Sequence, residues 1–206
     1  PVLSNILFEA VKGKIKVTAT DLEVAISHTT SAEEVSEEGC ITLPGKKLYE
    51  AIKELPAGNT IISCKKSNTA SIQQGAINFK LVGLPPEEFP KIPQTKEKES
   101  ITIGQKEIKK MIEMTAFAVS KDETRFVLNG VLIEIKQNTL RFVATDGRRL
   151  AHIKKEIKNA KKIQAKVIVP IKTIYELQKA LKGEGEEEIT IGVDANHVTF
   201  QLPETT

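Results

Sequence analysis

Arginine is rare in this sequence, and its placement is the first sign of chemistry. Of the 30 Lys and Arg residues only four are arginines, namely Arg125, Arg141, Arg148 and Arg149. Arginine is retained where a planar, permanently charged group is needed, because lysine is not an equivalent substitute. The cluster therefore indicates a site that uses guanidinium groups. Chance clustering on a solvated strand face is the alternative reading.

Two aspartates are the other candidates for chemistry. Asp21 and Asp146 each follow Ala-Thr at the end of an apolar, strand-like run. Two carboxylates could hold Mg²⁺, but these lie at equivalent positions of two separate modules, so each would act alone. A Thr-Asp pair also closes a tight turn by bonding its own backbone, and we favour that reading. The three histidines show no metal-ligand spacing. We predict no catalytic residue, no metal site and no cofactor.

Lysines at one position of three helical patterns suggest a phosphate-binding face. Lys46, Lys106 and Lys172 each stand near the expected start of a helix, where a positive charge opposes the helix dipole. A helix start beside an ammonium group is suited to phosphate. The abundance of lysine in the chain is the competing explanation. The predicted DNA-facing lysines are Lys46, Lys47, Lys106, Lys109, Lys110, Lys172 and Lys179.

An internal repeat predicts the elements that carry these residues. The sequence from Asn5 to Ser27 aligns with that from Asn129 to Ile153, and Asp21 aligns with Asp146, 125 residues later (146 − 21). Downstream, "ITLPGKKLYEAI" from Ile41 aligns with "VIVPIKTIYELQ" from Val167, and "ITIGQKEIKKMI" from Ile101 shows the same pattern of residue types. Each is a short strand followed by a helix, with proline expected just inside two of the helix starts. Helical spacing predicts one buried apolar stripe for each helix, at Leu48, Ala51, Ile52 and Leu55, at Ile108, Met111, Ile112 and Thr115, and at Ile174, Leu177 and Leu181. Alternating runs between the helices predict antiparallel strands.

We therefore expect an α+β fold of tandem modules, with antiparallel sheets outside and amphipathic helices inside. The predicted boundaries are a first domain at residues 1–90, an interdomain linker at 91–99 and a second domain at 100–206. The whole stretch 84–100, rich in Pro and charge, reads as a linker. A fourth helix and a last strand are missing from the pattern, so we expect the chain to be a piece of a longer protein.

Composition limits the partners and the compartment. The formal net charge of +3 is too small for a generally basic nucleic-acid binder, so any DNA contact needs a local basic face. Cys40 and Cys64 are isolated thiols, which indicates a reducing compartment. No apolar run approaches the length of a membrane span. We expect a cytoplasmic protein that does not bind membranes.

The stretch "RFVLNGVLIEI…LRFVATDGRRLA" (Arg125 to Ala151) resembles the bacterial DNA polymerase III beta subunit, the sliding clamp family. The segments "PVLSNILFEA", "TATDLEV" and "LPPEEFP" support the resemblance over nearly the whole chain. It implies a non-catalytic processivity factor of DNA replication, in which two subunits of three domains close into a homodimeric ring around duplex DNA. It also implies that polymerase, clamp loader and repair proteins dock through short linear peptides.

The resemblance also implies a role for the arginine cluster. The second-domain part of the peptide groove would comprise Arg125, Leu128, Thr145, Gly147, Arg148, Arg149 and Leu150. The two leucines would form an apolar floor, and Arg125 and Arg149 would donate hydrogen bonds to the peptide. Arg148 replaces a histidine common in the family, and Arg141 lies outside the groove. Phe126 and Val127 match positions that touch DNA at the mouth of the ring. A scaffold of the same fold that binds proteins without encircling DNA is the alternative function.

Overall fold

The computed structural model describes residues 2–65, 67–92, 100–122, 124–158, 163–183, 185–194 and 197–206. The chain divides into two compact units, Pro1–Pro93 and Gln94–Thr206. Most of the predicted linker 91–99 lies outside the described residues. Among those that are described, no helix is long and apolar enough to cross a membrane.

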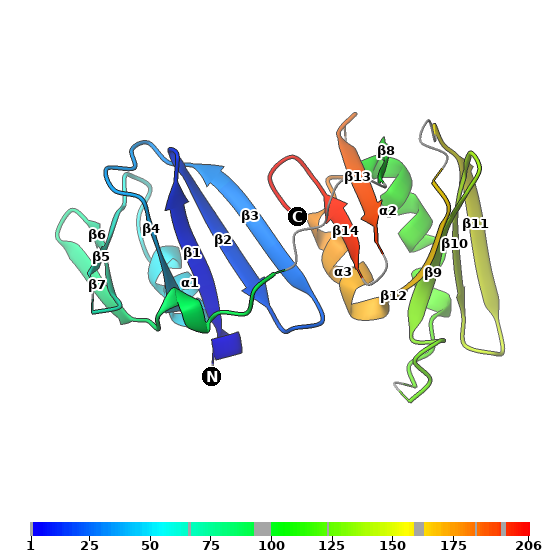
Figure 1. Ribbon diagram of the computed structural model, residues 1–206, viewed down its shortest axis with the longest axis horizontal. Helices are drawn as coiled ribbons and strands as arrows, with labels where there is room; N and C mark the ends of the chain where they lie inside the picture. The colour runs from blue at the N-terminus through cyan, green and yellow to red at the C-terminus, as the bar shows by residue number, and fades with distance from the viewer. Residues whose placement is uncertain are drawn as a thin grey trace. The chain divides into compact units, whose positions relative to one another are not determined.

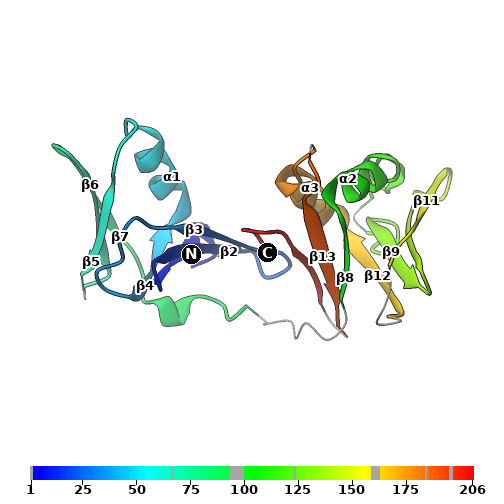
Figure 2. The same cartoon turned by 90° about the horizontal axis from the view of Figure 1, so that it is seen from above.

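Unit 1 is built from two antiparallel sheets and one helix. One sheet has the strand order β3-β2-β1-β4 and the other the order β5-β6-β7. Helix α1 packs against β1, β4 and β7, and Figures 1 and 2 show it over one face of the β1–β4 sheet. The elements are β1 (Asn5–Val11), β2 (Lys14–Thr20), β3 (Ala25–Ser31), β4 (Gly39–Pro44), α1 (Gly45–Lys53), β5 (Ile61–Lys65), β6 (Thr69–Gln74) and β7 (Ile77–Val82), with the 3-10 turns η1 (Val2–Ser4) and η2 (Pro86–Glu88).

Unit 2 repeats this plan with a second helix. Its sheets have the orders β11-β10-β9-β12 and β14-β13-β8, and α2 packs beside α3 (Figures 1 and 2). The elements are β8 (Ser100–Gly104), α2 (Gln105–Glu113), η3 (Ala116–Ala118), β9 (Gly130–Lys136), β10 (Thr139–Thr145), β11 (Leu150–Glu156), β12 (Ala165–Pro170), α3 (Ile171–Ala180), β13 (Glu188–Val193) and β14 (Val198–Gln201).

The predicted repeat is confirmed in the sheets. Strands β2 and β10 begin 125 residues apart (139 − 14). The sheet order β3-β2-β1-β4 in unit 1 corresponds to β11-β10-β9-β12 in unit 2, and in each unit the last strand named leads into a helix, α1 or α3. The predicted stripes in α2 and α3 are buried, including Ile108, Met111 and Ile174. They join Phe142 and other sheet residues in one apolar core.

Three local predictions need correction. Pro44 and Pro170 end a strand and occupy the N-cap position, so they stand just before the first helical residue and not inside the helix. Ile52 was expected in the buried stripe of α1 but is exposed. Its counterpart Ile112 is fully buried, in the unit where a second helix packs alongside.

The third correction concerns residues 84–89, which composition groups with the linker although the predicted first domain runs to residue 90. Leu84 forms an isolated bridge with Thr42 of β4, and the buried Thr42 hydroxyl donates to the Leu84 carbonyl at 2.8 Å. Phe89, just after η2, is also buried. Residues 84–89 are therefore part of unit 1. The neighbouring Gly83 has no room for a side chain, because a Cβ there would lie 2.0 Å from the Thr42 carbonyl oxygen.

Candidate functional site

The predicted groove residues of unit 2 are carried by a turn and a loop. Thr145 is the last residue of β10, Leu150 is the first residue of β11, and the turn between them contains Gly147, Arg148 and Arg149. The loop precedes β9 and contains Arg125 and Leu128. Strand β10 fixes where the turn begins, since its residues Phe142 and Ala144 are buried in the core.

Two side chains close the β10–β11 turn. The Thr145 hydroxyl accepts a hydrogen bond from the Gly147 backbone N–H at 3.1 Å and donates to the Arg149 carbonyl at 2.7 Å. The Asp146 Oδ1 accepts from the backbone N–H groups of Arg148 and Arg149, both at 3.0 Å. These two backbone hydrogen bonds are the main reason that the pKa of Asp146 lies below its ordinary value.

The same turn occurs in unit 1 with different residues. Thr20 accepts from the Leu22 N–H and donates to the Val24 carbonyl, and Asp21 accepts from the N–H groups of Glu23 and Val24. Leu22, like Gly147, has a positive φ, 79° against 88°. The prediction that each Thr-Asp pair closes a turn is confirmed. The turn itself therefore requires neither a glycine nor two arginines.

Arg149 makes contacts that its counterpart Val24 cannot make. Its Nε lies 3.0 Å from the Asp146 Oδ2, and its Nη2 donates to the backbone carbonyl of Phe117 at 2.7 Å. The guanidinium carbon also lies over the Phe117 ring, 5.7 Å from the centroid, at a distance typical of a cation–π contact. Arg149 thus ties the turn to η3, which follows α2.

Arg125 lies in a loop that is closed by its own hydrogen bonds. The Arg125 Nε is 3.3 Å from the Asp122 carboxylate, and the Arg125 carbonyl accepts from the N–H of Leu128. The Ser120 N–H donates to the Leu128 carbonyl at 2.9 Å, so the base of the loop follows directly on η3. Bonds from Thr124 lower the pKa of Asp122. Both arginines therefore have a carboxylate three residues before them.

Apolar side chains flank these polar groups. Leu150 is 68% exposed and Leu128 is half-buried. On the loop, Phe126 and Val127 are 84% and 71% exposed. Arg141, placed outside the groove by the sequence, pairs with Glu134 on the neighbouring strand at 3.1 Å.

The lysines predicted to face DNA lie on the three helices. Lys46, Lys106 and Lys172 are each the second helical residue and are exposed, as are Lys47, Lys110 and Lys179, while Lys109 is half-buried. The first N–H groups of α2 and α3 already donate to the carbonyls of Glu187 and Asn129. A phosphate at these two helix starts would therefore meet lysine side chains and not the first backbone N–H.

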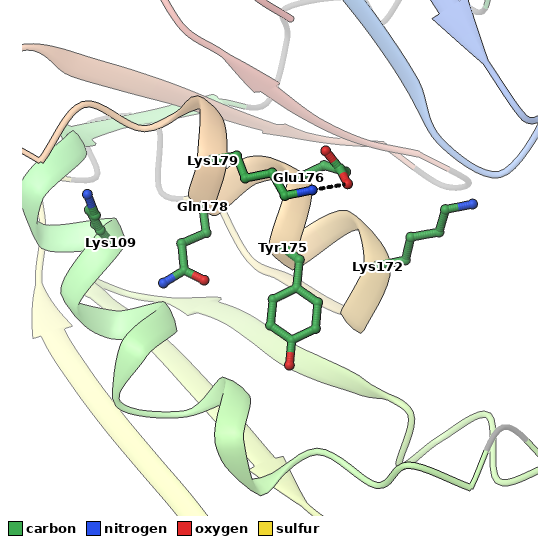
Figure 3. Close-up of a pocket in the computed structure, with 6 residues that line it drawn as sticks. All are labelled: Lys109, Lys172, Tyr175, Glu176, Gln178 and Lys179. Carbon is green, nitrogen blue, oxygen red and sulfur yellow. Dashed lines mark hydrogen bonds and ion pairs between the residues drawn. The ribbon is translucent and has the colours of Figure 1, made fainter.

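Helices α2 and α3 enclose a shallow concavity of about 480 Å³ (Figure 3). Lys179 pairs with Glu176 at 2.8 Å, and Tyr175 is partly exposed beside them. The lining residues are Lys109, Lys172, Tyr175, Glu176, Gln178 and Lys179. The basic character and open form of this face suit an extended anion better than a small substrate.

Two contributors to the site were absent from the predicted set. Phe117 contacts Arg149 from 32 residues away, and no repeat or spacing marks it. Asp122 could have been noticed, because it stands three residues before Arg125 just as Asp146 stands before Arg149. Among the described residues, no three His, Cys, Asp or Glu side chains gather as metal ligands.

Comparison with known proteins assigns the family. Residues 1–93 match the DNA polymerase III beta subunit, N-terminal domain, and residues 102–206 match the central domain of that subunit. The beta sliding clamp of Chlamydia pneumoniae is 36% identical over 205 residues, which is 100% of this chain and 55% of that protein.

Solved structures agree. The sliding clamp of Bacillus subtilis superimposes with a TM-score of 0.93 at 30% identity, over 100% of this chain and 56% of that one. A clamp from Pseudomonas aeruginosa bound to griselimycin gives a TM-score of 0.90 at 33% identity, over 100% of this chain and 55% of that one. The chain spans about half the length of these relatives. On this match over both units, the chain belongs to the DNA polymerase III beta subunit family.

Proposed function

We propose that this chain is part of a sliding DNA clamp, a non-catalytic protein that encircles duplex DNA and confers processivity on the replicative polymerase. Its relatives are named beta sliding clamps. Loading into a homodimeric ring around DNA would give processivity by topology, and the basic helices would hold the duplex without reading its sequence.

We further propose that polymerase, clamp loader and repair proteins dock on unit 2 through short linear peptides. The observation that carries this proposal is the duplicated turn. The four hydrogen bonds of its Thr and Asp side chains are the same in both units, but only unit 2 has Gly147, Arg148 and Arg149 in the turn and links a guanidinium to η3. Since the turn closes in unit 1 with other residues, the two arginine side chains are not needed to form it. A relative's binding of griselimycin is consistent with a ligand site in this family.

The peptide site is tested with a labelled peptide from the replicative polymerase of the same cell. In the natural full-length protein, Arg125→Ala and Arg149→Ala should each weaken peptide binding. The expected loss is roughly tenfold for each variant if it removes one charge-assisted hydrogen bond. Arg141→Ala is the matched control, because that arginine pairs with Glu134 outside the predicted groove. Equal binding by all three variants and the wild type would remove the groove assignment.

The DNA face is tested by charge reversal at Lys46, Lys106 and Lys172. Each lysine that stops binding a phosphate should reduce the slope of log affinity against log salt concentration by about 0.9. The control reverses Lys12, Lys14 and Lys16, exposed lysines of the β1–β2 hairpin, which changes the net charge equally. Loss of retention on circular DNA in the helix variant alone would support a clamp. Unchanged retention would favour the alternative scaffold that binds proteins without encircling DNA.

Phe126 and Val127 are proposed to touch DNA at the mouth of the ring. Their exposure on a loop that precedes β9 supports this role. Neither residue belongs to an apolar core, so replacing both by serine should leave stability nearly unchanged while weakening DNA retention.

A further inference from the structure

We propose that Phe117 is a positioning residue of the peptide groove, which acts by holding the guanidinium of Arg149 in one orientation. The inference rests on the proposed peptide-docking function of unit 2. Phe117 lies outside the set of residues that the sequence assigned to the groove.

The contacts of Arg149 define its orientation. Two of its nitrogen atoms are engaged from different parts of the chain, Nε by the Asp146 carboxylate and Nη2 by the Phe117 carbonyl. The ring of Phe117 lies against the guanidinium carbon as well. Because the guanidinium is planar, two hydrogen bonds at different nitrogens and one ring contact fix both its plane and its rotation. Its remaining N–H groups can then meet an acceptor without losing further conformational freedom.

The fold holds Phe117 in the place that these contacts need. Within η3, Ala116 and Ala118 are buried while Phe117 between them is 59% exposed. The 3-10 hydrogen bonds here end on the carbonyls of Thr115 and Ala116, which leaves the Phe117 carbonyl to accept from Arg149. Thr115 is fully buried, and its hydroxyl donates to the Met111 carbonyl at 2.7 Å. The ring and carbonyl therefore sit on an anchored backbone.

Unit 1 shows that this link is not required for the turn. Val24 occupies the place of Arg149, and its backbone N–H donates to Asp21 at 2.8 Å as that of Arg149 donates to Asp146. The turn closes there without any guanidinium. The contact between Arg149 and Phe117 is thus an addition to a turn that already folds, and orientation of the guanidinium is what it adds.

A first test needs no ligand. The 206-residue chain has four arginines, so its ¹⁵N spectrum should show four Nε–Hε signals. Phe117→Ala should shift the Arg149 signal and speed its exchange with water, because the ring no longer covers the guanidinium. Met114→Ala removes another exposed side chain of the same segment that makes no described contact with Arg149, and it should leave that signal in place. An unchanged Arg149 signal in Phe117→Ala would overturn the proposal.

A second test asks whether Phe117 acts through Arg149. Phe117→Ala should weaken binding of the polymerase peptide about two- to fivefold, the size of an exposed cation–π contact, and Phe117→Trp should restore it. In an Arg149→Ala background, Phe117→Ala should cost nothing more.

Equal losses in both backgrounds would mean that Phe117 contacts the peptide directly, and the positioning role would fail while the groove stands. Absence of peptide binding by the wild type would instead refute the groove, and the positioning role with it.

Discussion

Gly147 offers a test of backbone strain in the proposed groove. Its φ of +88° lies in the left-handed region, and a Cβ built there would meet no heavy atom within 4 Å. Gly147→Ala should therefore neither clash nor disturb the packing, so only the backbone preference changes. The left-handed conformation costs about 1–2 kcal/mol for an ordinary residue. Alanine also lowers the conformational entropy of the unfolded chain, which stabilises the folded state by about 0.4–1 kcal/mol and offsets part of this cost.

The net expectation is a loss of about 1 kcal/mol in the free energy of unfolding, or roughly a fivefold change in the unfolding equilibrium. For a unit of this size the melting temperature should fall by about 4 °C. Gly147→Asn should cost less than Gly147→Ala although asparagine is larger, because asparagine tolerates positive φ. Thermal and urea unfolding followed by circular dichroism would measure both variants.

Gly104 and Gly75 provide the controls. Gly104 also has open space around its Cβ position but an ordinary φ of −62°, so Gly104→Ala should be nearly neutral. Gly75, with a φ of +56° and open space, lies in unit 1, and Gly75→Ala should destabilise that unit instead. The reasoning would be refuted if Gly147→Ala were as neutral as Gly104→Ala, or if asparagine cost more than alanine.

Other substitutions test the packing and the charge of the two units. Gly83→Ala should destabilise unit 1 by about 2 kcal/mol or more in urea unfolding, because the backbone must move off Thr42 and break its hydrogen bonds to Leu84; a cost under about 0.5 kcal/mol would contradict this. Phe142→Ala should cost about 3–5 kcal/mol, since the ring is fully buried in the core of unit 2; a much smaller loss in the same assay would mean that the core refills the cavity. The folded pKa of Asp146 should lie below the ordinary 3.8, so its stabilising effect is complete above that pH and is lost as the pH falls through the folded value. A carboxyl ¹³C titration by NMR giving 3.8 or higher would exclude the depressed pKa.

The sequence predicted those parts of the fold that depend on local pattern. Alternation in "TLRFVAT" defined β10, and helical spacing located Ile108 and Met111 in the core. Failures occurred where burial depends on a distant neighbour. Ile52 and Ile112 have the same place in the pattern, but α2 packs beside α3 whereas α1 packs on strands. Leu84 looked like a linker residue because its partner, Thr42, is 42 residues away.

The candidate site shows the same division. The Thr-Asp turn was predictable because its bonds span only a few residues. The contact of Arg149 with Phe117 was not, since it joins the turn to a 3-10 helix 32 residues earlier in the chain. At the helix starts, the first N–H groups of α2 and α3 donate to the carbonyls of Glu187 and Asn129, which are distant in sequence and which no local pattern shows.

The pairing of the arginines answers why this lysine-rich chain keeps arginine here. Arg125 and Arg149 each lie beside a carboxylate three residues earlier, and all four groups are at least partly exposed. Exposed pairs of this kind contribute little to stability. A carboxylate can nevertheless hold one edge of a planar guanidinium and leave the other N–H groups for a partner, which the point charge of lysine cannot do. The arginines of the proposed groove are therefore better explained by orientation than by stability, whereas the proposed DNA contacts of the helix lysines would need only charge.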